Sequence, residues 1–154
     1  MIPEPPDLAS DPAVAATRGR ASIGGSALEP AVPATILRLA LPSPLRRLFD
    51  YLPPALPLDV IWQPGMRLRV PFGRREMIGI LIEVTQHSEV PVEKLKPASA
   101  LLDLHSPMPP AFFKLCLWTA QYYQHSLGDT LNWALPILLR QGEPAQVRQQ
   151  RFWQ

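Results

Sequence analysis

The chain has 154 residues, of which 20 are proline, 15 are lysine or arginine and 13 are aspartate or glutamate. This length suits one domain with tails, because domains usually run to about 100–200 residues, and it excludes a two-lobed motor. Proline at more than twice its average usage of about 5% disfavours long uninterrupted helices. The single cysteine, Cys116, leaves no pair for a disulfide framework or a CxxC metal site.

Targeting and membrane signals are weak. The N-terminus has prolines and acids instead of a basic stretch followed by an apolar one, which argues against a secretory signal. The longest apolar-rich stretch, residues 115–127, is interrupted by Gln121, Gln124 and His125 and falls short of the roughly 20 apolar residues of a membrane-spanning helix. We therefore expect a soluble cytoplasmic protein without membrane contact.

The formal net charge of +2 is unevenly distributed. Residues 1–35 carry two basic and four acidic side chains, whereas residues 36–96 carry nine basic and six acidic ones. The positive excess thus falls in a segment that also has the patterning of a folded domain, as a phosphate-contacting surface would require. An ordinary solvated surface explains the charge alone equally well.

Residues 1–34 are rich in proline, alanine, serine and glycine and have no sustained apolar period. Such a segment cannot bury enough apolar surface to offset the entropy lost on ordering, so we predict a disordered N-terminal leader. A folded domain is expected over residues 35–143.

Short extended segments separated by proline and glycine dominate the first part of this domain. Strands are predicted near residues 36–41, 48–52, 67–71, 77–85 and 94–102. Leu37, Leu39 and Leu41 alternate on one face of the first segment, and residues 67–71 alternate arginine with apolar residues, which predicts a strand with one wet, basic face. Four to five such strands favour a small, β-barrel-like bent sheet.

The segment at residues 77–85 has a more detailed pattern. Ile78, Ile80, Ile82 and Val84 are expected on one face, with Gly79 interrupting the other. A glycine within a strand is typical of a bulge or of close approach by another backbone or a ligand.

The last third changes to helical spacing. Apolar residues recur every three or four positions from Pro110 to His125, namely Phe112, Phe113, Cys116, Leu117, Ala120 and Tyr123. A second helix is expected from Asp129, a candidate N-cap, through Trp133 to Pro136. The predicted fold class is therefore α+β, a bent sheet followed by two C-terminal helices.

Motifs for catalysis are missing from the sequence. It contains no GxxxxGK[ST], HExxH or GxSxG, and His87, His105 and His125 are isolated from one another. A hydrolase that uses Asp50 with a histidine lacks a recognisable base, nucleophile and orienting group. We therefore predict that this chain is not an enzyme and has no catalytic or metal-binding residues.

A more informative set of residues surrounds Asp50, which lies between Phe49 and Tyr51 and follows Arg46 and Arg47. A carboxylate in basic surroundings repels phosphate but accepts a hydrogen bond from a hydroxyl, so it suits a sugar end better than a chain interior. Aromatic rings offer a stacking face to any base. Alternatively, Phe49 and Tyr51 are core residues that flank one exposed aspartate on a strand.

Two later segments extend this set. Gly73, within the run PFGRR at residues 71–75, has no side chain and could let the backbone touch a ligand. Lys94 and Lys96 add positive charge further along the chain.

Several ordered blocks resemble a known family. They are residues 40–45 (ALPSPL), 48–51 (LFDY), 65–75 (GMRLRVPFGRR), 78–81 (IGIL), 118–123 (WTAQYY), 127–129 (LGD) and 134–136 (ALP). Over about residues 36–144 the chain resembles the N-terminal, 3′-end-binding domain of primosomal protein N′, the bacterial replication-restart helicase. No single block is decisive, but their order and spacing together are specific.

The resemblance implies a DNA-binding module that holds the 3′-terminal nucleotide of the leading strand at a stalled fork. On this basis Asp50 would accept the 3′-hydroxyl, Phe49 would form the pocket wall, Gly73 would make a backbone contact and Lys96 a basic contact. The supporting basic and aromatic residues would be Tyr51, Arg46, Arg47, Arg74 and Arg75.

The resemblance also sets the wider expectations. The parent family is an ATP-dependent 3′-to-5′ DNA helicase, so ATP and zinc would belong to its other parts and this chain would need no cofactor. Forks with a free 3′ end would be the partner, in the nucleoid, with primosome and single-strand-binding proteins reached through a full-length parent. Residues 1–34 extend beyond the family pattern, and residues 144–154 would begin a truncated winged-helix domain.

One alternative remains. A generic basic β-barrel interaction module could bind protein or RNA through Arg67, Arg69, Arg74 and Arg75 as a nonspecific basic face.

Overall fold

The computed structural model describes residues 34–55 and 59–145. Nearly all of the expected leader, residues 1–33, and residues 146–154 of the expected winged-helix start lie outside the described residues. The elements along the chain are β1 (Ile36–Ala40), β2 (Phe49–Tyr51), β3 (Arg67–Phe72), β4 (Arg75–Thr85), the 3₁₀ turn η1 (Val92–Lys94), β5 (Ala100–Leu101), α1 (Pro110–Tyr122), α2 (Leu127–Ala134) and α3 (Ile137–Arg140).

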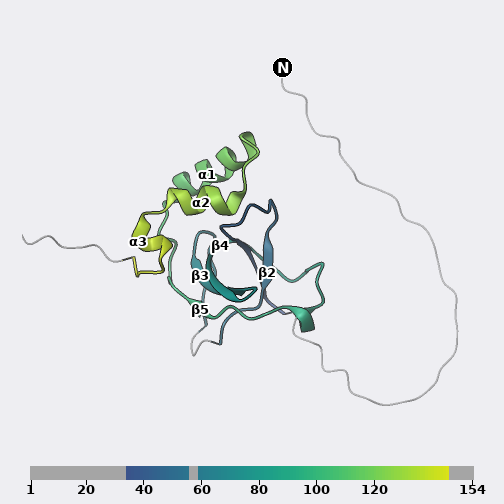
Figure 1. The fold of residues 1–154 in the computed structure, drawn as a ribbon. Coiled ribbons are helices and arrows are strands. Elements are labelled where there is room, and N and C mark those ends of the chain that lie inside the picture. Colours follow the sequence, from purple (N-terminus) through teal and green to yellow (C-terminus); the bar gives the residue numbers. More distant parts are fainter. Residues whose placement is uncertain (1–33, 56–58, 146–154) are drawn as a thin grey trace, which may run out of the picture. The chain divides into compact units, whose positions relative to one another are not determined.

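The strands form one antiparallel sheet in the order β2-β1-β4-β3-β5. The sheet is strongly curved but is not closed into a barrel (Figure 1). A single parallel bridge between Leu52 and Pro97 joins the end of β2 to the segment before β5. The expected α+β fold with a bent sheet of four to five strands is therefore confirmed; the sheet is not closed, although the Leu52–Pro97 bridge links its two edges.

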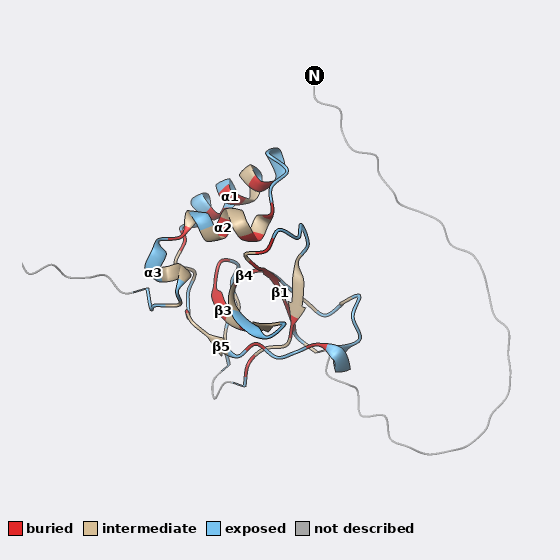
Figure 2. Ribbon diagram, viewed as in Figure 1, coloured by how far each residue is buried: buried red, intermediate tan, exposed pale blue. Residues whose placement is uncertain are grey.

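The concave side of the sheet holds the main core. Leu37, Leu39 and Leu41 are buried together, as their alternation predicts. The other buried members of this cluster are Tyr51, Met66, Leu68, Val70, Leu81 and Ala98. In Figure 2, β1 and β3 accordingly contain red, buried segments.

The predicted face of β4 holds through Ile82, which packs against the same cluster as Ile80, and is wrong at Val84. The pairing register shifts between Arg38 and Leu39, which face Glu83 and Leu81 and leave Ile82 as an extra residue. Such a bulge moves the following side chains to the other face, and Val84 is 42% exposed. At Gly79 the structure has neither the bulge nor approach by another backbone: a side chain packs there instead, and an added Cβ would lie 2.7 Å from Cδ2 of Leu41.

Helices α1 and α2 cover the other side of the sheet, over Ala40 and Ile80 (Figure 1). A second buried cluster forms there from Met108, Phe113, Cys116, Leu131 and Leu135 in addition to these two residues. Gly128 makes the contact between α2 and the end of β1 so close that a Cβ would overlap the main-chain carbonyl of Leu41. The helices therefore hold the outer face of β1 directly.

Several predicted helix details are wrong. Helix α1 ends at Tyr122 rather than near His125, and α2 begins at Leu127 with Ser126 as its N-cap. The Ser126 hydroxyl accepts the backbone N–H of Asp129, the residue that we had expected to be the cap. Phe112 and Tyr123 face solvent, with 40% and 64% exposure, because the side of α1 against the sheet is narrower than the predicted stripe.

Two further expectations need correction. Helix α2 ends before Pro136, as expected, but the sequence did not predict the short helix α3, whose N-cap is Pro136. Of the segment expected to be extended over residues 94–102, only Ala100 and Leu101 form a strand. None of the helices in residues 34–55 and 59–145 has the length and apolar character needed to cross a membrane.

The expected wet, basic face of β3 is also wrong at Arg67, which is fully buried. Its guanidinium donates to both carboxylate oxygens of Asp103, at 2.6 and 2.7 Å, and to the main-chain carbonyls of Leu139 and Glu143. Arg67 thus joins β3, the loop before α1 and the segment around α3. It is a structural cation and offers no charge to a ligand.

We predict that Asp103→Ala lowers the free energy of unfolding by about 3–5 kcal/mol, because it leaves a buried guanidinium without its carboxylate. Glu76→Ala should lower it by less than about 1 kcal/mol, since Arg69 and Glu76 form a longer, half-exposed ion pair of 3.9 Å on the same sheet. Urea unfolding followed by circular dichroism measures both. Equal effects of the two substitutions would contradict the assignment of Arg67 as a structural lock.

Candidate nucleic-acid interface

A cavity of about 660 Å³ lies beside β2. Its walls come from β2, the β3–β4 turn and the segment around η1. Phe49, Asp50, Gly73 and Lys96, which the sequence analysis selected as site residues, all line it. Residues about 45 positions apart in the sequence therefore meet in one cavity.

The supporting residues lie in three places. Arg47 and Tyr51 line the same cavity. Arg46 instead lines a smaller cavity of about 250 Å³ at the end of α1, where its guanidinium donates to the side chain of Gln124 at 3.3 Å. Arg74 and Arg75 are exposed at the β3–β4 turn and do not line the main cavity. The basic residues expected together are thus spread over three places.

Aromatic side chains form one wall. Phe49 packs edge-on against Phe72 with 5.2 Å between ring centroids, and the guanidinium carbon of Arg47 lies 4.9 Å from the centroid of the Phe49 ring. One face of Phe49 is therefore covered by a planar cation, which can itself stack on a base. Tyr51 is a core residue, which was the alternative interpretation of this strand. Its hydroxyl donates to the Pro71 carbonyl at 2.9 Å. Burial raises the pKa of Tyr51.

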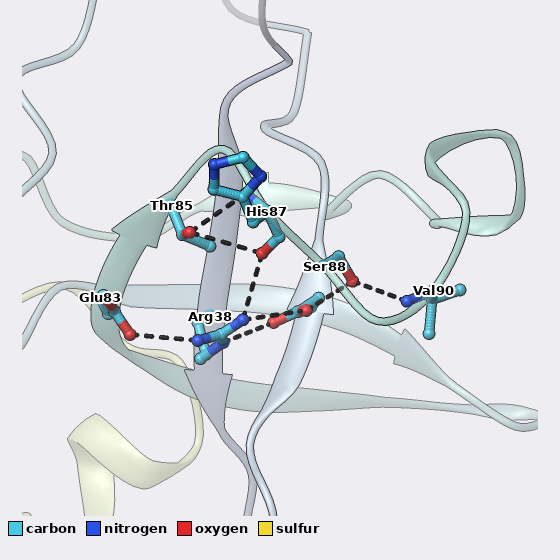
Figure 3. Close-up of polar contacts among 7 residues, drawn as sticks. Arg38, Glu83, Thr85, His87, Ser88 and Val90 are labelled. Atoms are coloured by element: carbon cyan, nitrogen blue, oxygen red, sulfur yellow. Dashed lines mark hydrogen bonds and ion pairs between the residues drawn. The ribbon is translucent and has the colours of Figure 1, made fainter. Parts of the chain in front are cut away.

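Asp50 is held by two donors that the sequence analysis missed. Arg38 on β1 donates from Nε to Oδ1 at 2.9 Å, and Ser88 after β4 donates from Oγ to Oδ2 at 2.6 Å. In Figure 3, Glu83 lies on one side of Arg38 and Ser88 on the other. The carboxylate that both Arg38 and Ser88 bond is that of Asp50, which carries no label there. The side chain of Asp50 is 13% exposed, so this carboxylate is fixed by protein contacts and little hydrated.

Arg38 binds three acceptors. Besides Asp50, its guanidinium donates to Glu83 at 3.2 Å and to the main-chain carbonyl of His87 at 3.2 Å. The hydrogen bond that Arg38 donates to Asp50 raises the pKa of Arg38. A charged residue between Leu37 and Leu39 in an apolar strand was the only sequence signal for it, and its partner could not be known without the strand register.

Gly73 forms the β3–β4 turn. Phe72 pairs with Arg75, so Gly73 and Arg74 make a two-residue connection, and Gly73 has a φ of 61°. A positive φ at the first position of such a turn is typical of glycine. An added Cβ at Gly73 would meet no other atom within 4 Å, so this backbone faces open space at the rim of the cavity.

Lys96 is placed by its backbone. Its carbonyl accepts the N–H of Leu52 at 3.0 Å, and the Ala98 N–H donates to the Leu52 carbonyl at 2.9 Å. These bonds hold the exposed Lys96 next to the end of β2. The charged residues that line the cavity are Arg38, Arg47, Lys94 and Lys96, with Asp50 and Glu89.

The arrangement suits an anionic ligand that carries a hydroxyl, since the cations outnumber the carboxylates and Asp50 is an acceptor among them. The main-chain carbonyl of His87 accepts a hydrogen bond from Arg38. Across residues 34–55 and 59–145, no three His, Cys, Asp or Glu side chains are grouped to hold a metal ion.

We predict that Gly73→Ala lowers the free energy of unfolding by about 1–2 kcal/mol, because a side chain disfavours the left-handed backbone even where space is open. Gly73→Asn should lower it by less, since asparagine adopts positive φ more readily. Urea unfolding of the two variants gives the comparison. A loss that is as large for asparagine as for alanine would show that strain is not the cause.

Comparison with known proteins places the chain among relatives of similar sequence. A family model described as the 3′DNA-binding domain (3′BD) of PriA matches residues 38–136. Replication restart protein PriA of Haemophilus influenzae is 44% identical over 118 residues, which are 77% of this chain and 16% of the relative. The PriA proteins of Buchnera aphidicola subsp. Schizaphis graminum and Rickettsia conorii are 27% and 29% identical, over 68% and 70% of this chain. The chain spans about 14–16% of the length of these curated relatives.

Proposed function

The chain belongs to the PriA 3′DNA-binding domain family, and from this membership we propose that it binds DNA in replication restart. We propose further that it holds the 3′-terminal nucleotide of a leading strand in the cavity beside β2. The observation that carries this second step is the Asp50 carboxylate, which lies among four cations in that cavity.

Carboxylates and cations have opposite preferences for the phosphate and hydroxyl groups of a nucleic acid. Arginine and lysine side chains attract the phosphates of any nucleic acid, while a carboxylate among them repels phosphate and lowers affinity for a chain interior. The same carboxylate gains a charged hydrogen bond when it meets a hydroxyl. A strand end with a free 3′-hydroxyl supplies both groups, a phosphate and a hydroxyl, within one nucleotide.

The neighbouring residues fit the rest of such a nucleotide. Lys96 and Lys94 are exposed on the η1 side and can reach the terminal phosphate. The guanidinium of Arg47, supported by Phe49, offers a flat surface to a base of any identity. The open backbone at Gly73 lets the sugar approach the turn closely.

The generic basic module is supported less well. Arg67 is buried, and Arg69 lies 3.9 Å from Glu76, so two of its four arginines are engaged within the protein. Arg74 and Arg75 remain exposed.

The wider roles belong to the parent protein in this proposal. A longer replication restart protein would supply ATP-driven unwinding, zinc binding and contacts with primosome and single-strand-binding proteins. This chain would contribute binding of the fork in the nucleoid and no ATP hydrolysis of its own.

We predict that Asp50→Ala weakens binding of a single strand with a free 3′-hydroxyl by about 10- to 100-fold, the value of one charged hydrogen bond. Affinity for the same strand ending in a 2′,3′-dideoxynucleotide should stay unchanged or rise, since this end lacks only the hydroxyl. Fluorescence anisotropy with 5′-labelled oligonucleotides measures both.

Glu83→Ala is the matched control, because Glu83 also pairs with Arg38 but does not line the cavity. It should leave the preference for the hydroxyl end intact. If Asp50→Ala changes the affinity for the hydroxyl end and the dideoxy end equally, the generic basic module is favoured.

Lys96→Ala should weaken binding of both ends alike and lower the slope of log affinity against log salt by about 0.7, the value for one phosphate contact on a single strand. Lys114→Ala removes an exposed lysine on α1, away from the cavity, and should leave the slope unchanged. Titrations over a series of salt concentrations give these slopes. A slope that changes equally in the two variants would mean that Lys96 acts through overall charge alone.

A further inference from the structure

Arg38 is placed by strand register directly between two carboxylates. On one side of β1 it faces Asp50 of β2, and on the other side it faces Glu83 of β4. Its neighbours Leu37 and Leu39 are fully buried in the core, so the backbone on both sides of Arg38 is fixed by packing. The side chain is 28% exposed and lines the cavity.

The donors around Asp50 use most of its accepting capacity. Among the residues that the structure describes, Oδ2 receives Ser88 Oγ at 2.6 Å and Arg38 Nη2 at 3.5 Å, while Oδ1 receives only Arg38 Nε at 2.9 Å. A carboxylate oxygen has two lone-pair sites. One site on Oδ1 is therefore left for a further donor, and the guanidinium and the serine determine where it points.

The loop after β4 is held through the same residues. Arg38 donates to the carbonyl of His87, and Ser88 accepts the N–H of Val90 while it donates to Asp50. Figure 3 shows this chain of contacts from Glu83 through Arg38 to Ser88 and Val90. Because Glu89 and Val90 line the cavity, the contacts to Arg38 and Asp50 also set this wall.

We propose that Arg38 is the positioning residue for recognition of the 3′ end: with Ser88 it orients the Asp50 carboxylate so that Oδ1 accepts one hydroxyl, and it compensates the negative charge of Asp50 near the terminal phosphate. The proposal rests on the proposed function, since it concerns the same cavity and the same strand end. Arg38 acts through Asp50 and makes no phosphate contact of its own.

This assignment differs from that of a cation which binds DNA directly. The side chain of Arg38 is already shared among three acceptors in the protein, whereas Lys94 and Lys96 are exposed and line the cavity from the η1 side. A guanidinium engaged on Asp50 has fewer N–H groups to offer a phosphate. Its removal should therefore alter selectivity for the hydroxyl more than it alters the salt dependence.

The test is a double-mutant cycle of Arg38→Ala and Asp50→Ala in the full 154-residue chain, with 3′-hydroxyl and dideoxy-terminated strands and two salt concentrations. Arg38→Ala alone should weaken binding of the hydroxyl end about tenfold more than binding of the dideoxy end, which loses only the compensation of the Asp50 charge. In the Asp50→Ala background, Arg38→Ala should have no further effect on the preference. The salt slope should be the same with and without Arg38.

Two further variants test the role of Arg38 even if Arg38→Ala destabilises the fold. Ser88→Ala reaches the same carboxylate from the loop and should reduce the preference in the same direction. Arg38→Lys keeps the charge without the planar guanidinium and should restore only part of the preference. Arg69→Ala is the matched control, since it removes a half-exposed arginine of the same sheet that does not line the cavity, and thermal unfolding of every variant is recorded.

The outcomes separate the two proposals. If the unmodified chain prefers the hydroxyl end and Asp50→Ala removes the preference while Arg38→Ala and Ser88→Ala do not, the role of Arg38 is overturned and the function stands. A fall of about 0.7 in the salt slope on removing Arg38, equal for both ends, overturns it as well by showing a direct phosphate contact. No preference in the unmodified chain overturns both.

Discussion

The antiparallel pairing of β1 with β2 on one side and β4 on the other determines both the core and the cavity wall. It places Leu37 and Leu39 in the concave core and Arg38 opposite Asp50 and Glu83. In a strand, successive side chains point to opposite faces, so burial of the leucines forces the arginine outward. The close contact of Gly128 with the Leu41 carbonyl fixes the end of β1 from the helical side.

Two arginines illustrate how the same side chain is used differently. Arg67 is completely buried, and its donors are taken by Asp103 and main-chain carbonyls near α3. Arg38 is partly exposed, and its partner Asp50 lies in a cavity with room for a ligand. Burial therefore separates Arg67, which holds elements together, from Arg38, which pairs with a carboxylate in the lining of a cavity.

The negative charge of Asp50 is already compensated within the protein. A lone carboxylate in a basic cavity would oppose a nucleic acid, but Asp50 is paired with a guanidinium and bound by a serine. In the proposed function, this pairing reduces the electrostatic cost of the carboxylate to a bound strand, and one accepting site on Oδ1 has no donor among the described residues. Lys94 and Lys96 keep their charges exposed on another wall.

Local sequence patterns predicted the approximate positions of most strands and of the first helix, and part of the lining of the cavity. Alternation in residues 36–41 predicted the buried face of β1, and the order of the family blocks selected Phe49, Asp50, Gly73 and Lys96, which the fold brings into one cavity. Patterns failed where several elements compete for the same residue. The cap of α2 is Ser126 because this side chain also bonds the Ser43 carbonyl, a residue far away in the sequence.

The sequence by itself therefore determined the α+β class, the approximate strand positions and a set of cavity residues, because these follow from period-two alternation, proline and glycine positions and a family pattern. Only the tertiary structure decided that Arg67 is buried, that β4 bulges at Ile82 and that Arg38 and Ser88 hold Asp50. The reason is that these features depend on strand register and on contacts between residues 36 or more positions apart, or 12 in the case of Arg38 and Asp50. Such contacts leave no period in the sequence from which they can be predicted.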